Sequence, residues 1–175
     1  MSPALPALHI AAASADDAPL ILALVRELAE YEKLADQVSA TEDALRESLF
    51  GERPAAEVLI ARVDGEPAGF ALFFGSYSTF LARPGIYLED LFVRPAFRGL
   101  GIGRALLIEV AALAVSRRCG RVEWSVLDWN EPAIGFYRRL GARPLDDWTM
   151  FRLVGPALDA LAASELKHPR AFQRP

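Results

Sequence analysis

An apolar strand pattern, a glycine-rich turn and a long apolar helix pattern follow one another near the middle of the chain. Residues 86–93 are predicted to form a strand that stops at Arg94-Pro95, and residues 100–118 a helix. The turn between them is Arg98-Gly99-Leu100-Gly101-Ile102-Gly103. Glycines permit a sharp turn and close approach of a ligand. The first N–H groups of a helix lack partners and lie at the positive end of its dipole, so the pattern predicts an anion site, most often for phosphate.

The glycine spacing excludes two common phosphate motifs. The dinucleotide motif G-x-G-x-x-G requires a last glycine, but that position is Arg104 if the motif starts at Gly99 and Leu106 if it starts at Gly101. The nucleoside-triphosphate loop G-x-x-x-x-G-K-[ST] is also absent. A turn that only permits tight packing remains an alternative. Three alternating glycines led by an arginine favour a ligand.

The other local patterns give the element order β, α, α, β, β, β, α, β, α, β. The expected strands are residues 9–12, 57–63, 67–74, 86–93, 121–127 and 149–154. The expected helices begin at Asp16 or Asp17, after Thr41, at Leu100 and after Asn130, and a short one covers residues 156–166. Asp64-Gly65 is a strong hairpin signal. A hairpin followed by two strand–helix units predicts an α/β (α+β) fold, a mixed sheet with helices on both faces.

Size and charge narrow the class of protein. The chain has 175 residues, of which 53% are hydrophobic, and a net charge of −4. We expect one domain at residues 9–166, with a flexible lead-in at 1–8 and a flexible tail at 167–175. The charge argues against nucleic-acid binding, and no apolar run approaches the roughly 20 residues of a membrane span. The single cysteine, Cys119, excludes an internal disulfide framework and is consistent with a cytoplasmic protein.

Arg-x-x-Gly-x-Gly at Arg98, Gly101 and Gly103 resembles the coenzyme A loop of the GCN5-related N-acetyltransferases (GNAT). The resemblance implies the GNAT fold, with a single mixed, mostly antiparallel sheet, and acetyl-CoA as acetyl donor. It also implies that loop amides hold the pyrophosphate and that the end of the preceding strand binds the pantetheine arm. The coenzyme-binding residues expected in this way are Leu91, Phe92, Val93, Arg98, Gly99, Leu100, Gly101, Ile102, Gly103, Arg104, Asn130, Pro132, Ala133 and Tyr137. For Arg104 a solvated side chain, and for Asn130 a simple helix cap, remain alternatives.

Four segments resemble one subfamily more closely. Residues 27–32, 87–90, 98–103 and 128–137 are similar to the spermidine/spermine acetyltransferases. Tyr77-Ser78-Thr79-Phe80 and Leu127-Asp128 resemble the thialysine branch, and the acidic residue and tryptophan of the polyamine branch near Thr79 are absent. The resemblance implies a small primary amine as acceptor and a homodimer.

Glu89 is the predicted base. An alkylamine has a pKa of about 10 and must lose a proton before it attacks a thioester. Strict alternation predicts two strand faces, with Tyr87, Glu89, Leu91 and Val93 on one and Leu88, Asp90 and Phe92 on the other. A carboxylate within an apolar strand is costly unless it has a role, so Glu89 is expected to take the proton directly or through water. A structural salt bridge is the alternative. Asp90 is expected to attract the cationic amine or to bridge subunits.

Tyr137 is the predicted acid, because its phenol pKa of about 10 is close to that of a departing thiol. The subfamily resemblance implies the same roles for Tyr137 and Glu89, and a core tyrosine is the alternative. Direct attack in one ternary complex needs no Ser-His-Asp or Cys-His arrangement. The two histidines, His9 and His168, lie near the termini, and no metal is expected.

The acceptor side is expected to include Tyr31, Glu32, Glu89, Asp90 and Trp124. A solvated acidic helix face remains an alternative for Glu32 and for Glu27 one turn earlier. Trp124, like Trp129 and Trp148, could equally fill the core. Two other functions stay open: acetylation of a protein lysine or N-terminus, and coenzyme A binding without catalysis.

Overall fold

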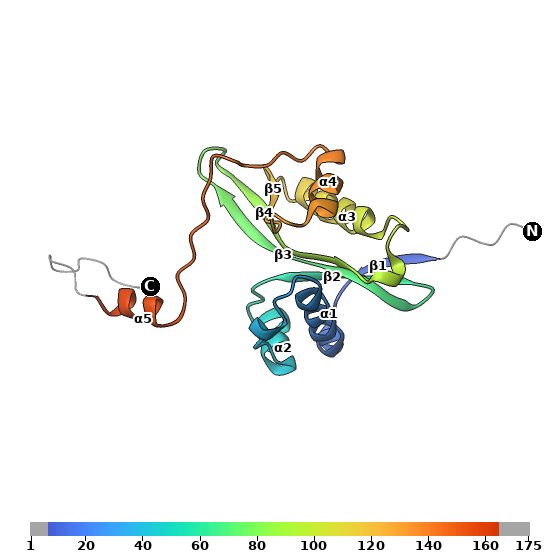
Figure 1. Cartoon of the computed structure of the whole chain (residues 1–175), viewed down its shortest axis with the longest axis horizontal. Helices are drawn as coiled ribbons and strands as arrows, with labels where there is room; N and C mark the ends of the chain where they lie inside the picture. Colours follow the sequence, from blue (N-terminus) through green and yellow to red (C-terminus); the bar gives the residue numbers. More distant parts are fainter. Residues whose placement is uncertain (1–6, 165–175) are drawn as a thin grey trace, which may run out of the picture. The chain divides into compact units, whose positions relative to one another are not determined.

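The computed structural model describes residues 7–164, which contain a five-stranded sheet in the order β1-β2-β3-β4-β5 (Figure 1). The strands are β1 (Leu8–Ala12), β2 (Glu57–Val63), β3 (Glu66–Ser78), β4 (Arg83–Val93) and β5 (Val122–Trp124). The first three neighbouring pairs are antiparallel, and β4 and β5 are parallel. The predicted mixed, mostly antiparallel sheet is therefore confirmed.

Five helices and three short 3-10 turns complete the described chain. The helices are α1 (Ala18–Tyr31), α2 (Glu42–Phe50), α3 (Ile102–Ser116), α4 (Glu131–Arg139) and α5 (Gly155–Ala163), and the 3-10 turns are η1 (Ala15–Asp17), η2 (Ala35–Gln37) and η3 (Pro95–Phe97). The chain forms two compact units, Met1–Leu127 and Asp128–Pro175. The whole sheet lies in the first unit, and α4 and α5 lie in the second. Within the described residues, no helix has the length and apolar character of a membrane span.

The sheet separates two hydrophobic cores (Figure 1). On one face α3 contributes Ile102, Leu106, Val110 and Ala114, spaced four residues apart so that they form one buried stripe. On the other face lie α1, with Ile21, Leu24 and Leu28, and Leu49 of α2. Helices therefore cover both faces, as predicted.

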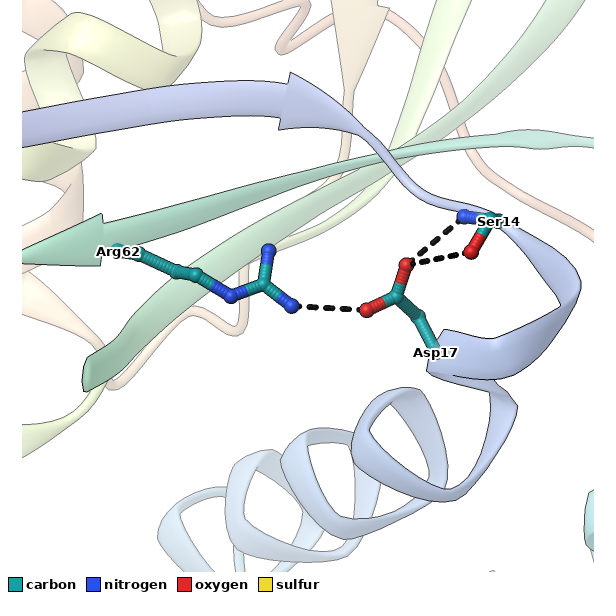
Figure 2. A network of polar contacts seen from close by, with 3 residues as sticks. All are labelled: Ser14, Asp17 and Arg62. Atoms are coloured by element: carbon teal, nitrogen blue, oxygen red, sulfur yellow. Dashed lines mark hydrogen bonds and ion pairs between the residues drawn. The ribbon is translucent and has the colours of Figure 1, made fainter. Parts of the chain in front are cut away.

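Local signals set the hairpin and the start of α1. Asp64 and Gly65 have φ angles of 50° and 87°, as a two-residue hairpin turn with two left-handed residues requires. Figure 2 shows the carboxylate of Asp17 accepting hydrogen bonds from the backbone N–H and hydroxyl of Ser14 and from Arg62 of β2, the last at 2.8 Å. Burial favours a higher pKa for Asp17, but these hydrogen bonds outweigh it and lower the pKa. Asp17 thus ties the start of α1 to the sheet.

Two predicted strands differ from the structure. Residues 149–154, predicted as a strand, have no regular secondary structure and belong to no sheet among the described residues, so that prediction is wrong. Their β-branched and aromatic composition reports local preference, whereas a strand also needs a hydrogen-bonded neighbour. The strand predicted at 121–127 is shortened to Val122–Trp124. Most of the proposed lead-in and all of the proposed tail lie outside the described residues.

Candidate active site

A β-bulge places Glu89 at a break in the β3–β4 ladder. Asp90 lies opposite Leu72 and Leu88 lies opposite Phe73. Glu89 is therefore an extra residue that has no pairing partner on β3. Its side chain is exposed, whereas Asp90 is half-buried.

The bulge also reverses the alternation of faces along β4. Leu88 and Leu91 both contact the core beneath α3, while Phe92 lies in the core beneath α1. Asp90 faces the α1 side, because it lies opposite Leu72, which packs on that core. The predicted strict alternation, which grouped Leu88 with Asp90 and Phe92, is therefore wrong, since one inserted residue exchanges the two faces.

β5 accompanies β4 only as far as the bulge. The pairing joins Ile86, Tyr87 and Leu88 to Val122, Glu123 and Trp124, and no residue of β5 is paired with the part of β4 from Glu89 to Val93. This stretch includes the three residues expected to bind the pantetheine arm, Leu91, Phe92 and Val93. A strand edge of this kind can pair with an extended ligand through its backbone groups.

Beyond β4 and η3, the glycine-rich turn leads directly into α3. Gly99 and Gly101 have φ angles of 82° and 80°, a region that glycine enters without steric cost. Gly101 is the N-cap residue of α3, and a Cβ added at either glycine would meet no atom within 4 Å. The two glycines therefore serve the backbone conformation rather than tight packing. Leu100, Gly101 and Arg104 are exposed, Ile102 is buried and Gly103 is half-buried, so the turn presents the start of α3 to solvent as an anion site requires.

The charges of Glu89 and Glu32 act on a third carboxylate, Asp90, beside the bulge. The pKa of Asp90 is raised to about 7, first by burial and then by the charges of Glu89 and Glu32. Burial also raises the pKa of Glu32, which is half-buried at the end of α1. A cationic amine bound here would relieve this repulsion. In the part of the chain that the structure describes, no group of three or more His, Cys, Asp or Glu side chains could hold a metal ion.

Arg98 contacts the acceptor side as well as the turn. Its Nε donates a hydrogen bond to the carbonyl of Val93 at 2.9 Å. Its Cζ lies 4.5 Å from the ring centre of Tyr31 and 5.8 Å from that of Phe92. The structure thus brings Tyr31, which was predicted to bind the amine, together with Arg98, Val93 and Phe92, which were predicted to bind the coenzyme.

A second arginine of the same connection was missed by the sequence reasoning. Arg94 forms a two-pronged ion pair with Glu27, Nε to Oε2 at 2.8 Å and Nη2 to Oε1 at 2.7 Å, and its Nη1 donates to the carbonyl of Pro67 at 2.8 Å. Glu27 is therefore ion-paired with Arg94, while 35% of its side chain remains exposed. Arg94 and Arg98 are four residues apart, as are Glu27 and Tyr31 on α1. This matching spacing was the sequence signal that the two pairs could meet.

The remaining predicted residues have ordinary structural environments. Trp124 is half-buried and packs against the core beneath α3, as does Cys119. Trp129 and Trp148 are exposed. Asn130 caps α4 by accepting a hydrogen bond from Ala133 N–H at 3.4 Å.

The rest of α4 has features of a stable short helix. Pro132 lies in the first turn of α4, and the Tyr137 ring centre is 5.2 Å from that of Phe136. Asn130, Pro132, Ala133 and Tyr137 all belong to the second unit.

Comparison with known proteins agrees with this geometry. The model of the acetyltransferase (GNAT) family matches residues 22–142. The chain therefore belongs to the GNAT family and is an N-acetyltransferase, which confirms the predicted family, fold class and enzyme class.

Individual relatives act on amines. The chain is 45% identical to the thialysine N-epsilon-acetyltransferase of Bos taurus, over 81% of this chain and 89% of the relative. It is 34% identical to the L-ornithine N5-acetyltransferase of Arabidopsis thaliana, over 87% of each chain. Among solved structures, an integron cassette protein from the mobile metagenome of V. cholerae superposes with a TM-score of 0.77 at 27% identity, over 90% of this chain and 98% of that one.

Proposed function

We propose that the protein transfers the acetyl group of acetyl-CoA to the primary amine of a small molecule by direct attack in a ternary complex. The proposed acceptor is a thialysine- or lysine-like amine, a diamine or a polyamine. One observation carries the proposal: the end of β4, which pairs with β3 but not with β5, starts at a bulge beside three carboxylates and leads through η3 to a glycine turn at the start of α3. The bovine and Arabidopsis relatives are named for the acetylation of side-chain amines, and this supports a small amine as the acceptor.

Two features of the described residues support coenzyme A as the ligand. The exposed turn of Gly99 and Gly101 supports pyrophosphate binding through the first N–H groups of α3. The edge of β4 beyond Leu88 that β5 leaves without a partner supports pairing with the extended pantetheine arm. When bound, acetyl-CoA supplies the acetyl thioester.

Glu89 is the proposed base, directly or through water. Its exposed side chain at the bulge is accessible to the ammonium group, and a carboxylate oxygen of Glu89 accepts the proton before the amine nitrogen attacks. Asp90 is the second candidate for this step, because its pKa of about 7 matches proton exchange near neutral pH.

Tyr137 is the proposed acid, whose hydroxyl gives a proton to the departing sulfur. This role rests on the family resemblance, as does a contact of Asn130 with the pantetheine arm. We also propose, on the same ground, a cytoplasmic homodimer.

Thiol release from acetyl-CoA tests the proposed reaction. We expect turnover with at least one of thialysine, lysine, ornithine, putrescine and spermidine, above that with a histone-like peptide. Turnover confined to the peptide would favour the protein acetyltransferase, because an extended basic chain requires an open acidic groove. Coenzyme A binding without turnover on any amine would favour the non-catalytic module.

Tyr137→Phe tests the acid separately. We expect kcat to fall by at least about tenfold, and by about 100-fold if the loss reaches the low end of general-acid effects. Phe136→Leu is the matched control, because it alters the neighbouring ring and leaves the hydroxyl. Normal turnover of Tyr137→Phe would remove the hydroxyl from the mechanism.

A further inference from the structure

Two arginines of the β4–α3 connection contact two residues on one face of α1. Arg94 and Arg98 flank η3, while Glu27 and Tyr31 lie one helical turn apart at the end of α1. Arg94 pairs with Glu27 and Arg98 lies over Tyr31. The connection that carries the proposed pyrophosphate turn is therefore fastened twice to the helix that carries the proposed amine side.

The environment of Arg98 suits positioning better than a phosphate contact alone. The guanidinium donates through Nε to Val93, the last residue of β4, and rests on the faces of Tyr31 and Phe92. A planar guanidinium can stack and donate at the same time, which an ammonium group cannot. Three contacts thus fix Arg98 immediately before Gly99, whose left-handed conformation begins the turn.

The Arg98–Tyr31 stack adjoins the acidic cluster, which consists of Glu32, Glu89 and Asp90. Tyr31 is the last residue of α1, and the next residue, Glu32, is one of the two charges that raise the pKa of Asp90. On the other side, Arg98 is covalently joined to the turn at Gly99. We therefore expect a change in the stack to shift both the turn and Glu32.

We propose that Arg98 is a positioning residue whose stacking on Tyr31 couples coenzyme A binding at the glycine turn to amine binding at the acidic cluster. The inference rests on the proposed function and adds a residue role to it. Linkage requires the coupling to be reciprocal. Because the stack holds the turn, Tyr31 influences coenzyme A affinity without being a coenzyme ligand, and because the stack also holds the end of α1, Arg98 influences amine affinity.

The test measures coenzyme A affinity by calorimetry in the absence of any amine. Tyr31→Leu removes the aromatic face, and we expect the dissociation constant to rise about two- to fivefold, the range of exposed cation–π contacts. Tyr31→Phe keeps the aromatic face and should bind coenzyme A more tightly than Tyr31→Leu. Arg98→Lys keeps the charge but loses the planar stack, so its affinity should fall as well, and it serves as the second variant if Tyr31→Leu folds poorly.

A double variant and a control complete the experiment. Tyr31→Leu combined with Arg98→Met should bind coenzyme A no more weakly than Arg98→Met alone, because the stack is already absent. Arg117→Gln, which removes an arginine paired with Glu57, controls for net charge. Unchanged affinity in both Tyr31→Leu and Arg98→Lys, or additive losses in the double variant, would overturn the coupling and leave the proposed function intact. Failure of the wild-type protein to bind coenzyme A would overturn both.

Discussion

At the scale of single residues, two adjacent carboxylates of β4 have different environments. The bulge leaves Glu89 exposed and turns Asp90 toward the end of α1. Glu89 is therefore accessible to the amine, while Asp90 is held next to other negative charges. Substitution of each carboxylate tests its environment by a different measurement, namely stability for Asp90 and reaction rate for Glu89.

Asp90→Asn should change how stability depends on pH. The pKa of Asp90 rises from 3.8 to about 7 on folding, so the native state keeps a proton that the unfolded chain releases. The stabilising contribution is complete below pH about 4 and is lost as the pH rises through about 7. Asn carries no charge, so the variant should be more stable than wild type by about 1–3 kcal/mol at pH 8.5 and closer to it at pH 5.

Urea denaturation at the two pH values measures this difference in unfolding free energy. Asp36→Asn, an exposed acid of η2, is the matched control. A stability difference that does not vary with pH would contradict the burial and charge repulsion assigned to Asp90.

Glu89→Gln should lower kcat/KM for the amine by about 100-fold at pH 7, the lower range of general-base effects. The loss should shrink at high pH, where more amine is already deprotonated. Rate profiles from pH 6 to pH 10 measure this. A loss that is constant over that range assigns Glu89 to amine binding. A profile that loses its base limb in Asp90→Asn instead assigns the proton to Asp90.

At the scale of elements, the turn before α3 carries the coenzyme proposal. Gly101 is left-handed, with φ of 80°, and has open space where a Cβ would stand. An added methyl group therefore strains the backbone without a clash.

Gly101→Ala should lower the unfolding free energy by about 1 kcal/mol and weaken coenzyme A binding. Gly75→Ala is the control, because its backbone is not left-handed and its Cβ would also meet no atom within 4 Å. Chemical denaturation and calorimetry give the two quantities. Equal behaviour of the two variants would show that the turn tolerates another conformation.

Elements governed by local signals were predictable from the sequence. The Asp64-Gly65 hairpin, the Thr41 and Asn130 caps and the strand–turn–helix around Gly101 follow from residue types at short range. Features that depend on pairing were not predictable. The bulge at Glu89 exists only in the register of β4 against β3, and local propensity placed a strand at residues 149–154 without regard to a neighbour.

The candidate site divides in the same way. The glycine turn and the acidic residues were found from the sequence, because each is a local pattern. The Arg94–Glu27 pair and the stack of Arg98 on Tyr31 join residues 67 positions apart. Such contacts are fixed by the fold, so the sequence could suggest them only through the four-residue spacing on each side.

At the scale of the whole molecule, the net charge hides two local groups of opposite charge. The net charge is −4, yet arginines flank the proposed phosphate turn and carboxylates gather at the bulge. All of these residues belong to the first unit, and the proposed acid, Tyr137, belongs to the second.

A competition assay tests the central claim most directly. The protein is incubated with labelled acetyl-CoA and an equimolar mixture of thialysine, lysine, ornithine, spermidine and a histone-like peptide, and the products are identified by mass spectrometry. The account predicts label on the side-chain or terminal primary amine of a small molecule. Label only on the peptide, or on no amine at all, would contradict it.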